Sequence, residues 1–94
     1  MNNQEYQGKM EYQLKELGEK IDELTNKAEN AAEDVKRGYR ENIDLLRSQK
    51  NVIQDKLQEL KNSSGETWDE IKDGLDRTWD ETKGIMKNAV SKLK

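Results

Sequence analysis

The clearest pattern in the chain spans residues 10–35, MEYQLKELGEKIDELTNKAENAAEDV. Steps of four and three along the sequence place apolar side chains on one stripe of an α-helix, which is the heptad pattern of a coiled coil. The apolar residues of this stretch that follow these steps are Met10, Leu14, Leu17, Ile21, Leu24, Ala28, Ala31 and Val35. The pattern therefore predicts a long amphipathic helix with a single apolar seam.

The seam continues downstream with one change of phase. Tyr39 and Ile43 follow Val35 at two successive steps of four, which is a stutter that locally unwinds a left-handed supercoil. The heptad then resumes, interrupted once by Lys50, at Leu46, Ile53, Leu57 and Leu60. Because the chain contains no proline, nothing in this half of the sequence forces a break. We therefore predict one uninterrupted coiled-coil helix over residues 1–62.

A turn is predicted where the sequence reads NSSG, at residues 62–65. Ser63 is followed three residues later by Glu66, which is the spacing of a capping box at the start of a new helix. Asn, Ser and Gly in succession also compete with helix for the backbone. We expect a turn with a capping box at residues 63–66, which would make the chain a helical hairpin; a single continuous rod is the alternative.

An 11-residue repeat follows this turn. The segment TWDEIK at residues 67–72 returns as TWDETK at residues 78–83. This period corresponds to about 3.67 residues per turn, so the stripe runs nearly straight along a helix, unlike a heptad seam. The repeat predicts a second, shorter amphipathic helix over residues 66–94. Its apolar stripe consists of Trp68, Ile71, Leu75, Trp79, Met86 and Val90.

Composition restricts the chemistry that the chain can perform. The 94 residues include no Cys and no His, which excludes Cys or His nucleophiles, zinc fingers and disulfides. The net charge of −3, with both signs mixed along the chain, argues against a nucleic-acid binder. The serines have no base beside them and the glycines form no phosphate loop. We therefore expect no catalytic residues, no cofactor and no metal, and a protein that is not an enzyme.

The small apolar content favours association between chains. Only 31% of the residues are hydrophobic, which is little for a self-sufficient core in a chain of this length. We expect a structural or interaction protein that self-associates as a dimer, bundle or filament, with Trp68 and Trp79 as anchors. The expected seam residues are Leu14, Leu17, Ile21, Leu24, Val35, Ile43, Leu46, Ile53, Leu57, Leu60, Trp68, Ile71, Leu75, Trp79, Met86 and Val90.

The order of these residues resembles a small bacterial family of coiled-coil stress-response proteins. The residues that carry the resemblance are Tyr6, Lys9-Met10, Gln13-Leu14, Ile21-Asp22, Leu24, Lys27-Ala28-Glu29, Tyr39, Leu46-Arg47, Lys56-Leu57, Glu59-Leu60-Lys61, Ser64, Trp68, Lys72, Gly74, Trp79 and Lys83. The resemblance implies an all-helical cytosolic protein without an established molecular activity. The absence of a signal-like or membrane-spanning stretch favours the same cytoplasmic location.

Reversible binding to a membrane or another apolar surface is the alternative function. The 11-residue repeat is similar to repeats of exchangeable apolipoproteins and of desiccation-protective proteins. From Thr82 to the end, the chain carries four lysines and no acidic residue, as an anionic surface would require. The same lysines also complement the dipole at the C-terminal end of a helix, while the acidic segment before them opposes membrane binding.

Overall fold

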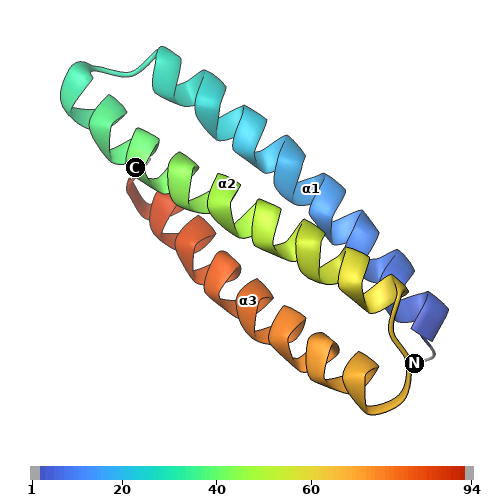
Figure 1. The fold of residues 1–94 in the computed structure, drawn as a ribbon. Helices are drawn as coiled ribbons and strands as arrows, with labels where there is room; N and C mark the ends of the chain where they lie inside the picture. Colours follow the sequence, from blue (N-terminus) through green and yellow to red (C-terminus); the bar gives the residue numbers. More distant parts are fainter. Residues whose placement is uncertain (1–2, 93–94) are drawn as a thin grey trace.

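The computed structural model describes residues 3–92, without the side chains of Val90 and Lys92. The described chain forms three helices, α1 (Asn3–Glu29), α2 (Glu33–Lys61) and α3 (Gly65–Lys92). They lie side by side, with α2 antiparallel to α1 and α3, in a bundle measuring 50 × 18 × 17 Å (Figure 1). The all-α fold predicted from the sequence is confirmed.

The predicted uninterrupted helix over residues 1–62 is wrong, because the chain turns at residues 30–32. The amides of Asn30 and Ala31 donate to the carbonyl oxygens of Lys27 and Ala28 at 3.3 and 3.2 Å. These short-range bonds tighten the last turn of α1. Ala32 is then extended, with φ −63° and ψ 155°, and α2 begins at the next residue.

Tertiary packing explains this break better than local sequence does. Ala32 occupies the N-cap position without a side-chain cap, and alanine is a poor residue there. Glu33 and Asp34 in the first turn of α2 suit the positive end of the helix dipole. The turn lets α2 fold back along α1, so the two halves of the heptad seam bury each other. The stutter over residues 35–43 therefore follows a boundary between two helices.

The second turn lies at residues 62–64, but the predicted capping box is wrong. Ser63 Oγ donates to the carbonyl oxygen of Glu59 at 2.7 Å, so this side chain closes α2 and does not cap α3. The helix that follows begins at Gly65, whose φ of +62° lies in the left-handed region. Glycine adopts this conformation without the steric penalty of a Cβ atom.

One apolar core runs along the bundle, and α2 contributes to it on two sides. α2 packs against both α1 and α3. The largest fully buried side chains are Leu17, Leu24, Leu46, Ile53, Leu60, Leu75 and Thr82. The first part of the seam, which lies in α1, is therefore covered by α2 of the same chain.

Two lysines of α2 cross the helix interfaces beside glycines. A Cβ atom added at Gly18 of α1 would lie 3.3 Å from Lys50 Nζ, and one added at Gly74 of α3 would lie 3.3 Å from Lys56 Nζ. The missing Cβ atoms leave space for the long lysine side chains. This explains why Lys50 can interrupt the seam without separating α2 from α1.

The left-handed start of α3 leads to a stability prediction. We expect Gly65→Ala to lower the free energy of unfolding by about 1–2 kcal/mol, because alanine is strained at positive φ. Gly84→Ala is the matched control, since Gly84 lies within α3 with open space around it. That variant should raise the free energy of unfolding by about 0.5–1 kcal/mol. Urea unfolding followed by circular dichroism measures both, and shifts of the same sign would contradict the assignment.

Candidate functional site

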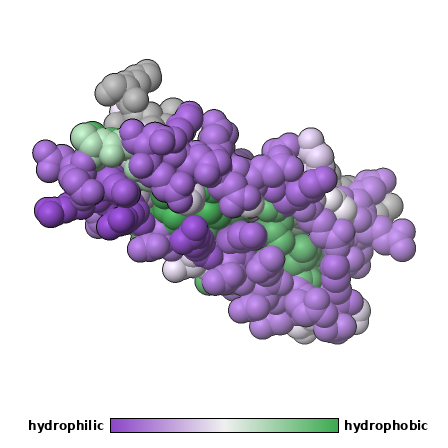
Figure 2. Space-filling view, turned by 90° about the horizontal axis from the view of Figure 1, so that it is seen from above, coloured by the Kyte–Doolittle hydropathy of each residue, from purple (hydrophilic) through white to green (hydrophobic). Residues whose placement is uncertain are grey.

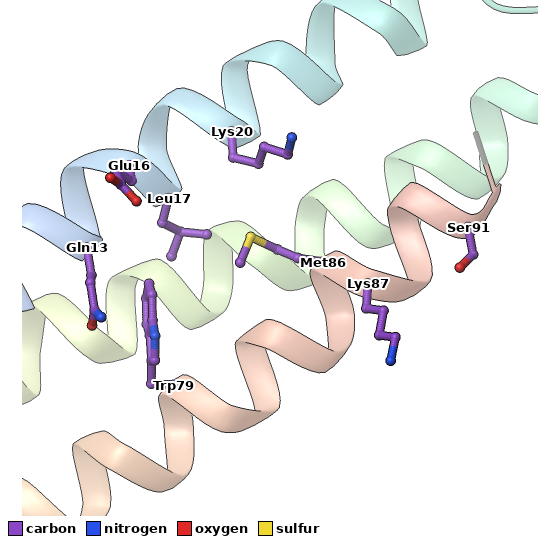
Figure 3. Close-up of a pocket in the computed structure, with 8 residues that line it drawn as sticks. All are labelled: Gln13, Glu16, Leu17, Lys20, Trp79, Met86, Lys87 and Ser91. Carbon is purple, nitrogen blue, oxygen red and sulfur yellow. The ribbon is translucent and has the colours of Figure 1, made fainter. Parts of the chain in front are cut away.

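The bundle has an open side between α1 and α3. Within the described chain, the backbones of α1 and α3 each approach α2 closely but do not approach each other. A mainly apolar cavity of about 430 Å³ lies between them, which we call the α1–α3 groove (Figure 3). Its lining residues are Gln13, Glu16, Leu17 and Lys20 from α1, and Trp79, Met86, Lys87 and Ser91 from α3.

The apolar wall of the groove comes from both helices. Trp79 extends from α3 toward α1, and Leu17 projects from α1 into the space beside it (Figure 3). Both side chains are buried, whereas Met86 is only partly buried and packs at the edge of the core. Figure 2 shows hydrophobic residues in a strip between hydrophilic flanks on one face of the molecule. Among the apolar residues of the groove, Met86 is thus the one whose replacement disturbs the core least.

Charged and polar residues are placed unevenly along the groove. Gln13 and Glu16 lie toward one end, and Lys87 and Ser91 lie toward the other (Figure 3). Lys20 lies on α1, opposite Met86 and Lys87 of α3 (Figure 3). The groove therefore combines an apolar middle with a basic end.

Two buried polar atoms of the groove residues have no hydrogen-bond partner among the described residues. They are the indole Nε1 of Trp79, which is a donor, and the amide Oε1 of Gln13, which is an acceptor. Leaving such atoms unpaired costs about 1–3 kcal/mol each.

A cluster around Tyr6 joins α1 to α3 near one end of the bundle. Tyr6 Oη donates to Asp76 Oδ1 at 2.7 Å, and Lys72 Nζ pairs with Asp76 Oδ2 at 3.1 Å. The Tyr6 ring meets Trp68 edge-on, with centroids 5.6 Å apart, and Lys72 Nζ lies 5.1 Å from the Tyr6 centroid. We call these four residues the Tyr6 clasp. It links the two helices that lack close backbone contact.

The surroundings of Tyr6 shift its ionisation. Burial raises the pKa of the Tyr6 hydroxyl above its ordinary value of 10.0, and the hydrogen bond to Asp76 and the negative charges of Asp76 and Asp73 raise it further. The folded chain therefore holds this proton more tightly than the unfolded chain does. The clasp depends on the protonated hydroxyl, because only that form donates to Asp76.

The seam residues named from the sequence mostly lie inside one chain. Those that are buried are Leu17, Ile21, Leu24, Ile43, Leu46, Ile53, Leu57, Leu60, Trp68, Leu75 and Trp79. Leu14, Ile71 and Met86 are partly buried against them. Val35 is 45% exposed near the start of α2, away from the core. Val90 lies in α3, but its side chain is outside the described part of the chain.

Sequence reasoning identified only the apolar wall of the groove. It named Leu17, Trp79 and Met86, but not the polar residues that lie around them. Lys87 was noted only as one of the four C-terminal lysines that could meet an anionic surface, and the polar lining residues that it missed are Gln13, Glu16, Lys20 and Ser91. No sequence signal marks them, because they come together only through the alignment of α1 with α3.

The α1–α2 interface carries a different kind of depression. Its lining is rich in charges of both signs, with Glu11, Lys15, Glu19, Asp22, Arg47 and Lys50 among the residues. Mixed charges favour solvent and exposed ion pairs over an apolar ligand. The α1–α3 groove is therefore the better candidate site for an apolar partner.

Comparisons with known proteins do not add a function to this geometry. The chain matches no protein-family model, no curated protein and no solved structure. Within residues 3–92, no helix combines the length and apolarity required to cross a bilayer. The same described residues contain no group of three or more acidic, His or Cys side chains placed to hold a metal ion. Any assignment of function therefore rests on the site itself.

The Tyr6 clasp predicts a loss of stability at alkaline pH. Below pH 10 the hydroxyl is protonated in both states, so its contribution to folding is complete. Above that pH the unfolded chain releases the proton first, and the contribution falls as the pH rises. We expect Tyr6→Phe to lower the free energy of unfolding by about 1 kcal/mol at neutral pH. Above pH 10, the free energy of unfolding should fall less in this variant than in the parent.

Urea unfolding between neutral pH and pH 11 tests this prediction. Tyr12→Phe is the control, because Tyr12 is 64% exposed. Its alkaline loss should differ less from that of the parent than the loss of Tyr6→Phe does: the hydrogen bond to Glu16 raises the pKa of the Tyr12 hydroxyl, but solvent screens this exposed interaction. An alkaline loss in Tyr6→Phe as large as in the parent would show that another group is responsible.

Proposed function

We propose that this protein is a non-enzymatic interaction protein whose α1–α3 groove binds an elongated apolar partner. The observation that carries the proposal is the groove itself, with a mainly apolar lining and a volume of about 430 Å³. Pockets for small ligands typically measure about 300–1,000 Å³, with mainly apolar walls and a few polar groups.

Binding in the groove does not require the bundle to open. The apolar stripe of α3 is turned inward, and Leu75, Thr82 and Ala89 are fully buried. Insertion of α3 into a membrane would first expose this stripe to water, at the cost of its contacts with α2. An apolar partner in the groove meets Met86 and the walls around it while the core stays closed. This difference favours the groove over membrane insertion.

The stress-related role and the cytoplasmic location belong to the same proposal. Their support is the sequence resemblance to the stress-response family. A binding module of this kind suits a stress role because it needs no cofactor and no catalytic residues.

The groove proposal predicts binding of a neutral apolar dye. We expect Nile red to bind the parent protein with a rise in fluorescence, and Met86→Gln to bind about tenfold more weakly, equivalent to about 1.4 kcal/mol. The weaker binding follows from a polar amide replacing apolar contact in the groove. Fluorescence titration gives both affinities, and circular dichroism checks that the variant remains helical.

Val35→Gln is the matched control for this experiment. Val35 is an exposed apolar residue at the start of α2, outside the groove. Its replacement should leave the dye affinity unchanged. Equal binding by Met86→Gln and the parent would place the dye elsewhere and contradict the proposal.

Self-association is a second candidate, because two of the three exposed apolar side chains of α2 lie close together on its surface. Leu45 is 48% exposed and Val52 is 41% exposed. Their spacing of seven residues puts them on the same side of the helix. Two copies that pair these surfaces would cover both side chains, and the two subunits would use the same patch.

Sedimentation equilibrium tests self-association. We expect a molar mass above 11.0 kDa for the parent at micromolar concentration, and a return toward 11.0 kDa when Leu45→Gln and Val52→Gln are combined. Tyr12→Gln removes an exposed side chain from α1 and should leave the mass of the parent unchanged. A parent that stays monomeric at these concentrations would eliminate the second candidate.

A further inference from the structure

The charges of the α1–α3 groove point to the class of ligand. Lys20 lies on the α1 rim of the groove and Lys87 lies on the α3 rim, with the Lys87 side chain directed away from α1; Trp79 and Leu17 form the apolar stretch between the helices (Figure 3). The single acidic lining residue, Glu16, lies toward the opposite end. An elongated molecule with one anionic end and an apolar body matches this arrangement.

The two lysines are available to a ligand. Lys87 has no ion-pair partner among the described residues, and Lys20 pairs only with Glu23, at 3.6 Å. That pair is half exposed, and exposed pairs of this kind contribute little to stability. From Thr82 onward the sequence contains four lysines and no acid, so no negative charge of this segment opposes an anion.

The shape of the groove favours a straight chain over a compact ring system. Its lining residues on α3 extend from Trp79 to Ser91, which corresponds to about 18 Å along a helix. The lining residues of α1, from Gln13 to Lys20, correspond to about 10 Å and face the part of this stretch from Trp79 to Lys87 (Figure 3). The groove is therefore a slot along two helices, in which an extended hydrocarbon chain makes the most contact.

We propose that the α1–α3 groove binds a free fatty-acid-type carboxylate, with its hydrocarbon chain along Leu17, Trp79 and Met86 and its carboxylate at the end of the groove whose rims carry Lys20 and Lys87. This inference rests on the proposed function of the groove and names the ligand class. A free amphiphile fits better than a membrane surface, because the apolar stripe of α3 stays buried in the bundle.

A comparison of laurate with lauryl alcohol, which has the same chain length, tests the carboxylate. We expect laurate to bind the parent about tenfold more tightly than the alcohol, as two partly exposed ion pairs allow. Isothermal titration calorimetry below the micelle concentration gives both affinities. The preference for laurate should shrink when the salt concentration is raised, because salt screens exposed charges. The salt series tests the inference on the parent protein alone.

The lysines are tested by a double variant, Lys20→Gln with Lys87→Gln. It should lose most of the preference for laurate while binding the alcohol as the parent does. Lys15→Gln with Lys83→Gln is the matched control, since it removes the same charge from the same helices outside the groove. This control should retain the preference of the parent.

Each remaining outcome separates the ligand class from the groove itself. Equal binding of laurate and the alcohol would overturn the carboxylate while leaving the apolar groove in place. Failure of laurate, the alcohol and Nile red to bind would overturn both proposals. Binding to phosphatidylglycerol vesicles without binding of free laurate would assign the basic end to a membrane surface instead.

Discussion

The fold depends on one constraint, which is that α2 must bury apolar side chains against two neighbours at once. Leu46, Ile53 and Leu60 are fully buried within this central helix. Only 31% of the residues are hydrophobic, so the chain has few apolar side chains to bury. Those of α2 therefore pack against both α1 and α3. Sharing α2 between α1 and α3 produces a continuous core without a partner chain. It therefore replaces the contact that an isolated coiled-coil helix would need from another molecule.

The same constraint leaves the side between α1 and α3 open. The backbones of α1 and α3 both pack closely on α2 and not on each other. Contact between α1 and α3 is therefore made by side chains, and the Tyr6 clasp is the best defined of these contacts. The groove beyond the clasp has an apolar wall that includes Trp79, with Lys20 and Lys87 toward its basic end. Binding in this space is thus a consequence of how the core is shared, and it needs no catalytic group.

Sequence patterns predicted the helical class and the approximate place of the second turn, because periodicity and turn residues are local properties. The first turn escaped detection, since neither proline nor glycine marks residues 30–32 and Ala32 is a poor N-cap. Only the gain from packing α2 onto α1 explains it. The apolar wall of the groove was within reach of pattern analysis, and so was the basic C-terminal segment that includes Lys87, whereas Lys20 resembled an ordinary solvent-exposed lysine.

Composition and periodicity alone establish an α-helical chain with amphipathic stripes and without Cys or His chemistry, since these follow from residue identity and spacing. Tertiary structure decides which apolar stripes pack against each other. It turns a seam expected between molecules into the interior of one bundle, and it makes a groove from residues more than 60 positions apart, such as Gln13 and Trp79. The physical reason is that burial depends on the alignment of whole helices, a property that no single segment carries.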